Sequence, residues 1–335
     1  MTGSATVGWC PGALRPMASG DGLILRVKPR GGALTLDEAA TIADLSARFG
    51  NGHLDLTSRA NIQIRGARDE TVEPLLAGLR EADLLDRDAE IEARRNIVAS
   101  PLAGLDPGCF DIRPFLAALE QGLAREPALQ VLPAKWSFNV DGGGCLPLAG
   151  VPADVRFVFD AGGGLRVGLA GFTSVPLSAD LDLPRFLTRL AALVARAPAR
   201  MAAIVERRGP APIFVALDLI EGDPTMPEPS RDGDPFRCLK DVVAFAPPFG
   251  DLPAETLKAS VSACRAAGGT GLRLTPWRVA LATGLAAGDA VRAKLAALGL
   301  IVRADDPRRG VTACVGAPAC HRASAPTRTD AALIT

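Results

Sequence analysis

Two cysteines near the end of the sequence are spaced so that they could bind metal. Cys314 and Cys320 stand six positions apart in the segment ACVGAPACHRA, and His321 follows directly. Thiol pairs at short spacing form half of many zinc and iron–sulfur sites, and His321 is a fallback ligand for zinc or iron. Two free thiols in a loop are the alternative. The pair therefore predicts a metal or cluster site whose remaining ligands lie elsewhere.

A second stretch, LTSRANIQIRG (56–66), carries polar side chains at every second position. These residues are Arg59, Asn61, Gln63 and Arg65. On a strand, this spacing places all four side chains on one face. Two guanidinium groups and two amides suit a flat ligand with several carboxylates, because arginine pairs with a carboxylate through two hydrogen bonds. A solvated sheet face is the alternative.

Two shorter stretches add basic residues that would be weak signals alone. ARRNIVASPLAG (93–104) places two arginines and Asn96 before a predicted strand, and Lys135 begins another in LPAKWSFNV (132–140). Exposed lysine and arginine are common on any surface. These residues gain meaning only if the fold brings them to the same ligand.

The elements that must position these residues repeat along the chain. GLILRVKP (22–29) reads as a strand, and 35–50 as a helix with Thr35 as its N-cap and Gly50 as its stop. Two strands joined by a tight corner and a helix over 69–85 follow. Residues 241–284 show the same order and align without a gap when moved back by 218 positions. We therefore predict an internal duplication.

A different kind of unit separates the two copies. Its patterns predict a helix, a strand, a hairpin with a glycine turn and a second helix, and a segment rich in Pro, Asp and Gly follows. The predicted parts are a first half-domain (1–90), a first α/β unit (91–220), a linker (221–235), a second half-domain (236–305) and the start of a second α/β unit (306–335).

Composition excludes several classes of protein. The 335 residues have a formal net charge of zero, which argues against a general nucleic-acid-binding surface. No signal peptide and no run of eighteen apolar residues is visible, so we expect neither export nor a membrane span. Seven mostly isolated cysteines do not suggest a disulfide framework. We expect a cytoplasmic protein.

Together, the motifs resemble the nitrite and sulfite reductase family. The order T-S-R-x-N-I-Q, then R-N-I, then L-P-x-K, lies inside a duplicated chain. The family's fold is α+β, with two ferredoxin-like half-domains alternating with mixed α/β units, and it holds sirohaem beside a [4Fe-4S] cluster. The resemblance implies that Arg59, Gln63, Arg95 and Lys135 bind tetrapyrrole carboxylates. Asn61, Arg65 and Asn96 fall within or beside the same motifs.

The opening CPGALRPMASGDGLILRV (10–27) is similar to that of the precorrin-3B synthases, the cobalamin-pathway branch of this family. Ala60 and Ser137 replace the Gln and Lys usual in the reductases, which weakens a sirohaem interpretation. The resemblance implies a monooxygenase that hydroxylates precorrin-3A with O₂ and forms a lactone. Its electrons would come from a donor protein or an NADH-linked reductase, and a non-haem iron could activate O₂. A sirohaem-dependent reductase and a tetrapyrrole-binding protein without turnover are the alternatives.

In this family the cluster is held by Cys-x5-Cys and, some forty residues later, Cys-x3-Cys. Cys314 and Cys320 match the first pair. In the first α/β unit, Ser100 stands where Cys314 stands in the second, and Gly143 where the second pair would begin; the same step from Cys314 passes Thr335. We therefore expect the chain to lack the second pair, through truncation. Supply by another chain, absence of a cluster and substitution by Cys145 are alternatives.

Overall fold

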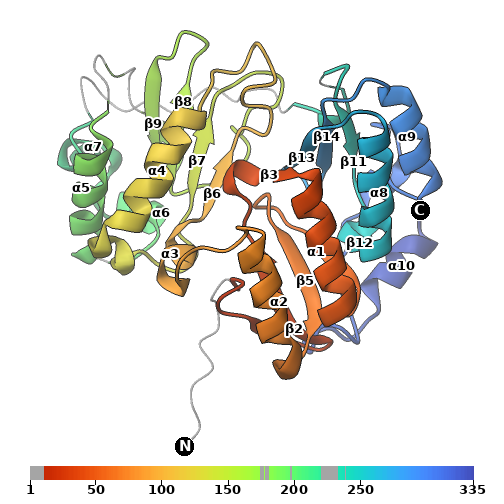
Figure 1. The fold of residues 1–335 in the computed structure, drawn as a ribbon. Helices are drawn as coiled ribbons and strands as arrows, with labels where there is room; N and C mark the ends of the chain where they lie inside the picture. The colour runs from red at the N-terminus through yellow and green to blue at the C-terminus, as the bar shows by residue number, and fades with distance from the viewer. Residues whose placement is uncertain (1–10, 174–176, 178–180, 197, 220–232, 238) are drawn as a thin grey trace, which may run out of the picture. The chain divides into compact units, whose positions relative to one another are not determined.

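The computed structural model describes residues 11–335 except 174–176, 178–180, 197, 220–232 and 238 (Figure 1). The chain divides into two compact units. The repeat unit comprises Pro11–Asp86 and Asp234–Thr335, and the inserted unit comprises Arg87–Gly233. The linker predicted at 221–235 lies almost wholly outside the described residues.

Two antiparallel sheets form the repeat unit. The first has the order β1 (Met17–Ser19), β2 (Gly22–Val27), β5 (Ile62–Ala67), β4 (His53–Leu56) and β12 (Asp251–Pro253). The second has the order β11 (Val243–Phe245), β14 (Ala280–Thr283), β13 (Gly271–Leu274) and β3 (Ala33–Thr35). Each copy therefore gives one strand to the sheet of the other copy: β12 pairs with β4, and β3 pairs with β13.

The backbone confirms the predicted shift of 218 positions. Strands β3 and β12 are related by it, as are β4 and β13. Gly31 and Phe249 share φ 57° and ψ 19°. Ala60 and Arg278, at the corners that join the paired strands, have φ of 53° and 59°. The two copies thus repeat even the left-handed corners that L-residues adopt at a cost.

Four helices pack on the sheets and complete a shared core. These are α1 (Leu36–Phe49), α2 (Asp69–Glu81), α8 (Ala254–Ala266) and α9 (Gly288–Ala297). The short α10 (Thr327–Leu333) contributes Arg328, which pairs with Asp55 and Asp251. Helix α1 begins as predicted, because the Thr35 side chain accepts from the Glu38 N–H while Glu38 bonds back to Thr35. Helices α1 and α8 lie side by side (Figure 1). One apolar cluster includes Leu54 of the first copy and Leu252 of the second.

The inserted unit is built on a mixed sheet. Its order is β10 (Phe172–Thr173), β9 (Leu165–Leu169), β8 (Val155–Phe159), β7 (Phe138–Asp141) and β6 (Ile97–Ala99). Strands β6, β7 and β8 are parallel, whereas β8, β9 and β10 are antiparallel, as the predicted hairpin requires. The helices are α3 (Ala89–Arg94), α4 (Arg113–Arg125), α5 (Leu183–Ala195), α6 (Met201–Arg208) and α7 (Pro210–Ala216). A separate core around Phe138, Phe157 and Phe186 holds this unit together.

Candidate functional site

The stretch from Arg59 to Arg65 is only partly a strand. Strand β5 begins at Ile62, and Arg59 lies in the turn that joins β4 to β5. The Thr57 N–H donates to the Asn61 carbonyl at 3.0 Å and the Ala60 N–H to the Thr57 carbonyl at 3.3 Å, which closes the turn. In the amide orientation that satisfies its side-chain oxygen and nitrogen, Asn61 Nδ2 donates to the carbonyls of Arg59 and Ala60 at 3.2 and 3.3 Å. The prediction that all four side chains share a strand face is therefore wrong for Arg59 and Asn61.

Strand β5 nevertheless contributes to a polar row across the first sheet. The register places Arg26 opposite Gln63, Gln63 opposite Asp55, and Asp55 opposite Asp251. Because side chains alternate along a strand, these four residues share one face of the sheet. The other face carries buried residues such as Ile64. We call the four residues, with Arg65, the polar face of the first sheet.

Arg65 is engaged by protein groups rather than open to a ligand. Its Nε and Nη2 donate to the two carboxylate oxygens of Asp21 at 2.9 and 2.8 Å, and its Nη1 donates to Asp55 at 3.0 Å. Nη2 also reaches Ser19 Oγ and the Ala319 carbonyl. Burial opposes its charge, but the hydrogen bonds to Asp21 and the charges of both carboxylates outweigh burial and raise the pKa of Arg65. The predicted ligand residue thus acts here as a structural cation.

The two cysteines lie in a loop of the repeat unit that is well supplied with hydrogen bonds. Cys314 is exposed and Cys320 is half-buried. Thr327 Oγ1 donates to the Cys314 carbonyl at 2.8 Å and lies 3.4 Å from Cys314 Sγ. That contact, with the Gly316 N–H, lowers the pKa of the Cys314 thiol. A thiol whose pKa is lowered is the better metal ligand.

The two cysteines alone do not complete the ligand set of a cluster. Among the residues that the structure describes, no group of three or more His, Cys, Asp or Glu side chains could hold a metal ion. A cubane [4Fe-4S] cluster normally takes four thiolates, so Cys314 and Cys320 fit one half of such a set. Cys145 belongs to the inserted unit. The assignment of the two thiols as cluster ligands stays a prediction.

The remaining predicted residues all belong to the inserted unit. Arg95 follows α3, is buried, and places Nη1 at 3.6 Å from Glu120 Oε1. Asn96 Nδ2 donates to the Ala93 carbonyl at 2.7 Å. Lys135 is exposed in a turn, because β7 begins only at Phe138. Of these three residues, Lys135 presents its charge most openly to solvent.

One arginine of the same motif was not predicted to be functional. Arg94, the last residue of α3, is only 9% exposed. Its Nε and Nη1 are buried and have no hydrogen-bond partner within the part of the chain that the structure describes. A buried cation without a partner costs free energy unless an anion from outside the chain satisfies it. The adjacent arginines at 94 and 95 were the available signal, but a pattern cannot tell which one is paired.

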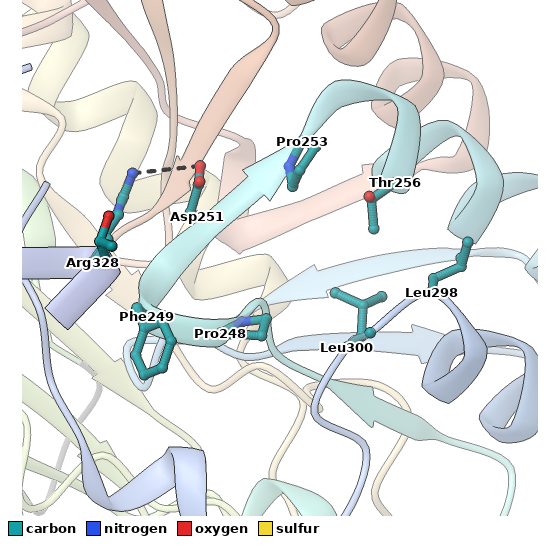
Figure 2. A pocket seen from close by; sticks show the side chains of 10 residues that line it. Pro248, Phe249, Asp251, Pro253, Thr256, Leu298, Leu300 and Arg328 are labelled. Atoms are coloured by element: carbon teal, nitrogen blue, oxygen red, sulfur yellow. Dashed lines mark ion pairs between the residues drawn. The ribbon is translucent and has the colours of Figure 1, made fainter. Parts of the chain in front are cut away.

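A cavity of about 380 Å³ lies in the repeat unit, between η4 (Pro248–Gly250), the end of α9 and α10 (Figure 2). Phe249, Pro248 and Leu300 form its apolar wall, and Arg328 lies at its edge. Arg328 is already paired, at 3.4 Å, with Asp251. The cavity therefore offers no unpaired cation to a polycarboxylate, and its size is at the lower end for ligand sites.

Comparison with known proteins shows which family the chain resembles. Residues 15–82 match the family model described as the nitrite/sulfite reductase ferredoxin-like half domain. The chain is 29% identical over 334 residues to a precorrin-3B synthase of Sinorhizobium sp, which covers 94% of this chain and 70% of that enzyme. The chain is therefore similar to proteins of the nitrite and sulfite reductase family. The matched half domain contains the stretch from Arg59 to Arg65.

Two further proteins of this kind agree with the fold. The NirA protein of Mycobacterium tuberculosis superposes with a TM-score of 0.72 and 25% identity, over 93% of this chain and 63% of NirA. A ferredoxin–nitrite reductase of Leptolyngbya laminosa is 30% identical over 201 residues, 54% of this chain and 38% of that enzyme. The chain thus spans less than two thirds of these two relatives. The predicted α+β architecture with a duplicated half-domain is confirmed.

Within this family fold, the predicted ligand residues fall into two groups. Arg59, Asn61, Gln63 and Arg65 belong to the repeat unit together with both cysteines, whereas Arg95, Asn96 and Lys135 belong to the inserted unit. Among the described residues, no helix is long and apolar enough to cross a membrane. The site assignments themselves remain predictions.

Proposed function

We propose that the protein is an oxidoreductase of the precorrin-3B synthase type, acting in aerobic cobalamin biosynthesis. It would hydroxylate precorrin-3A and close a lactone. The observation that carries this proposal is the extent of similarity: the match to the Sinorhizobium synthase runs over 94% of the chain, whereas that to the Leptolyngbya nitrite reductase runs over 54%. Substitution of Gln by Ala60 and of Lys by Ser137 supports a tetrapyrrole other than sirohaem.

The chain's own residues would bind and orient the substrate. Arg94 offers a buried guanidinium with two unpartnered nitrogens, and Lys135 offers an exposed ammonium. Arg59 is half-buried in the β4–β5 turn, and Gln63 lies in the polar face of the first sheet. Cations and amide donors of this kind suit the carboxylates at the rim of a tetrapyrrole. Each such contact would restrict the orientation of the bound macrocycle.

The reaction needs electrons from outside the chain. One oxygen atom of O₂ enters the substrate, and the other is reduced to water with two electrons and two protons. We assign the electrons to a donor protein or an NADH-linked reductase. Cys314 and Cys320 would supply two ligands of a [4Fe-4S] cluster, which when complete passes electrons one at a time.

Mass spectrometry with labelled oxygen tests the proposal. The protein is incubated with precorrin-3A, ¹⁸O₂, NADH and a ferredoxin-type reductase, and we expect a product that carries one ¹⁸O atom. Omission of the reductase should abolish the product. A chlorin-like absorption of the purified protein with consumption of nitrite or sulfite would instead identify a sirohaem reductase. Bound tetrapyrrole without turnover would identify a binding protein.

A further inference from the structure

We propose that Arg65 and the β1–β2 turn are a docking device that positions the cysteine loop, residues 314–327. Arg65 is then a positioning residue rather than a ligand of the tetrapyrrole. The docking itself involves contacts within the repeat unit alone. Only its consequence, correct placement of Cys314 and Cys320 for a cluster, rests on the proposed function.

The first contact of this device holds the residue before Cys320. The Ala319 carbonyl accepts from the Gly20 N–H at 3.0 Å, from Ser19 Oγ at 2.6 Å and from Arg65 Nη2 at 3.3 Å. Asp21, in the same turn, holds Arg65 in place through two hydrogen bonds. Three donors converging on one carbonyl fix the backbone beside a cysteine more firmly than solvent could.

Gly20 shows that the turn and the loop are shaped for each other. A Cβ at position 20 would lie 2.2 Å from the Pro318 carbonyl oxygen and 2.9 Å from the Ala319 carbonyl carbon. The φ angle of Gly20 is not positive. Glycine is therefore required here for space and not for backbone conformation. Any side chain at position 20 would push the loop away.

The second contact holds the far end of the loop. Thr327 hydrogen-bonds to the Cys314 carbonyl, and the next residue, Arg328, forms ion pairs with Asp55 and Asp251. Asp55 also accepts from Arg65 Nη1. Asp55 therefore pairs with both cations that hold the loop. These are Arg65, which donates to the Ala319 carbonyl, and Arg328, which directly follows Thr327.

The second copy of the fold shows that Arg65 is not needed to build the sheet. The position related to Arg65 by the shift of 218 is Thr283, a buried residue that bonds to the Gly271 carbonyl at 3.2 Å within its own hairpin. The same strand pairing thus forms without an arginine or a carboxylate pair. What the first copy adds is the contact with the cysteine loop.

Gly20→Ala tests the proposal without removing a charge, and Gly310→Ala is its matched control, because a Cβ there meets no atom within 4 Å. Hydrogen exchange followed by mass spectrometry reports the amides of Ala317 and Cys320, and iodoacetamide labelling reports access to Cys320. We expect Gly20→Ala to speed both by about tenfold or more while β4 and β5 keep their protection. Gly310→Ala should change neither.

Arg65→Lys is a second variant, since lysine keeps the charge but has one nitrogen in place of three and cannot reproduce the five hydrogen bonds of the guanidinium to Ser19, Asp21, Asp55 and Ala319. It should loosen the loop in the same direction. Unchanged loop exchange in both variants, or equal loss of protection in the loop and in β5, would overturn the proposal. Neither readout needs substrate, metal or turnover. If the proposed reaction is not found, the result for the loop therefore still holds. If the loop is unaffected in both variants, the proposed reaction is not contradicted.

Discussion

Arg94 and Arg95 form a matched pair in which substitution by methionine should have opposite effects on stability. Both side chains are buried, at 9% and 6% exposure. Arg95 lies 3.6 Å from Glu120, whereas the Nε and Nη1 of Arg94 have no partner among the described residues. Methionine keeps much of the length of either side chain and packs adaptably. The comparison therefore isolates the cost of the unpaired charge.

The magnitude follows from the groups that lose or keep partners. Each buried, unsatisfied polar group costs about 1–3 kcal/mol, so Arg94→Met should raise the free energy of unfolding of the inserted unit by about that amount. Arg95→Met removes the cation that lies 3.6 Å from the half-buried Glu120 carboxylate and should lower the same free energy, by roughly 3 kcal/mol. If Arg94 binds a substrate carboxylate, Arg94→Met should also weaken binding of uroporphyrin III, a stable polycarboxylate probe, by about 1.5–3 kcal/mol.

Two measurements check this prediction. Hydrogen exchange of peptides from β7 and β8 in increasing denaturant gives the stability of the inserted unit. Fluorescence titration with uroporphyrin III gives the affinity of each variant. If Arg94→Met destabilises the unit as much as Arg95→Met does, Arg94 is paired in solution and the reasoning fails. If stability rises but uroporphyrin binding is unchanged, the missing partner is not a tetrapyrrole carboxylate.

Three further outcomes are expected. Arg59→Ala and Lys135→Ala should each weaken uroporphyrin III binding by about 1.5–3 kcal/mol with little change in thermal stability. Lys294→Ala on α9 is the control. Unchanged affinity in both variants would show that Arg59 and Lys135 are ordinary surface residues. Burial raises the pKa of the Cys264 thiol from 9.0 to about 11, so the stability that the neutral thiol contributes is complete below pH 9.0 and lost as the pH rises toward 11. The free energy of unfolding in urea should therefore decline less over this pH range in Cys264→Ala than in the unmodified protein. An identical decline in both would contradict the raised pKa. Leu252→Ala should cost about 2–5 kcal/mol and reduce hydrogen-exchange protection in both copies of the repeat, whereas a loss confined to the second copy would refute the shared core.

Local signals predicted the elements well, because each rests on chemistry within a few residues. Thr35 and Glu38 define the start of α1, and alternation of apolar residues defines β4 and β5. The repeat was visible because both copies keep the same spacing. The exchange of β3 and β12 was not predicted, since a strand of three residues does not encode which sheet it joins. Tertiary packing alone decides that pairing.

The site was predicted less completely, because its meaning depends on partners far away in the chain. Arg65 looked like a ligand residue, but its contacts come from Asp21, Asp55 and the Ala319 carbonyl, the last 254 residues away in sequence. In the sequence Arg94 looked equivalent to Arg95, and only their side-chain partners in the fold distinguish the two. Residue type thus predicted where the charges are, while the fold determines which of them are already neutralised.

The duplication gives the fold two equivalent sheets, but only one keeps a row of polar side chains on its open face. In the first sheet, Arg26 and Gln63 stand opposite each other, and in the second sheet their counterparts are Ala244 and Leu281, at 2% and 0% exposure. An apolar, buried pair offers no side-chain hydrogen-bond donor, so the second copy does not repeat the polar row of the first. The second copy instead supplies β12, whose Asp251 extends the polar row of the first sheet. The two copies of the repeat have thus taken different roles, because the first carries the row of polar side chains and the second completes the sheet on which that row is built.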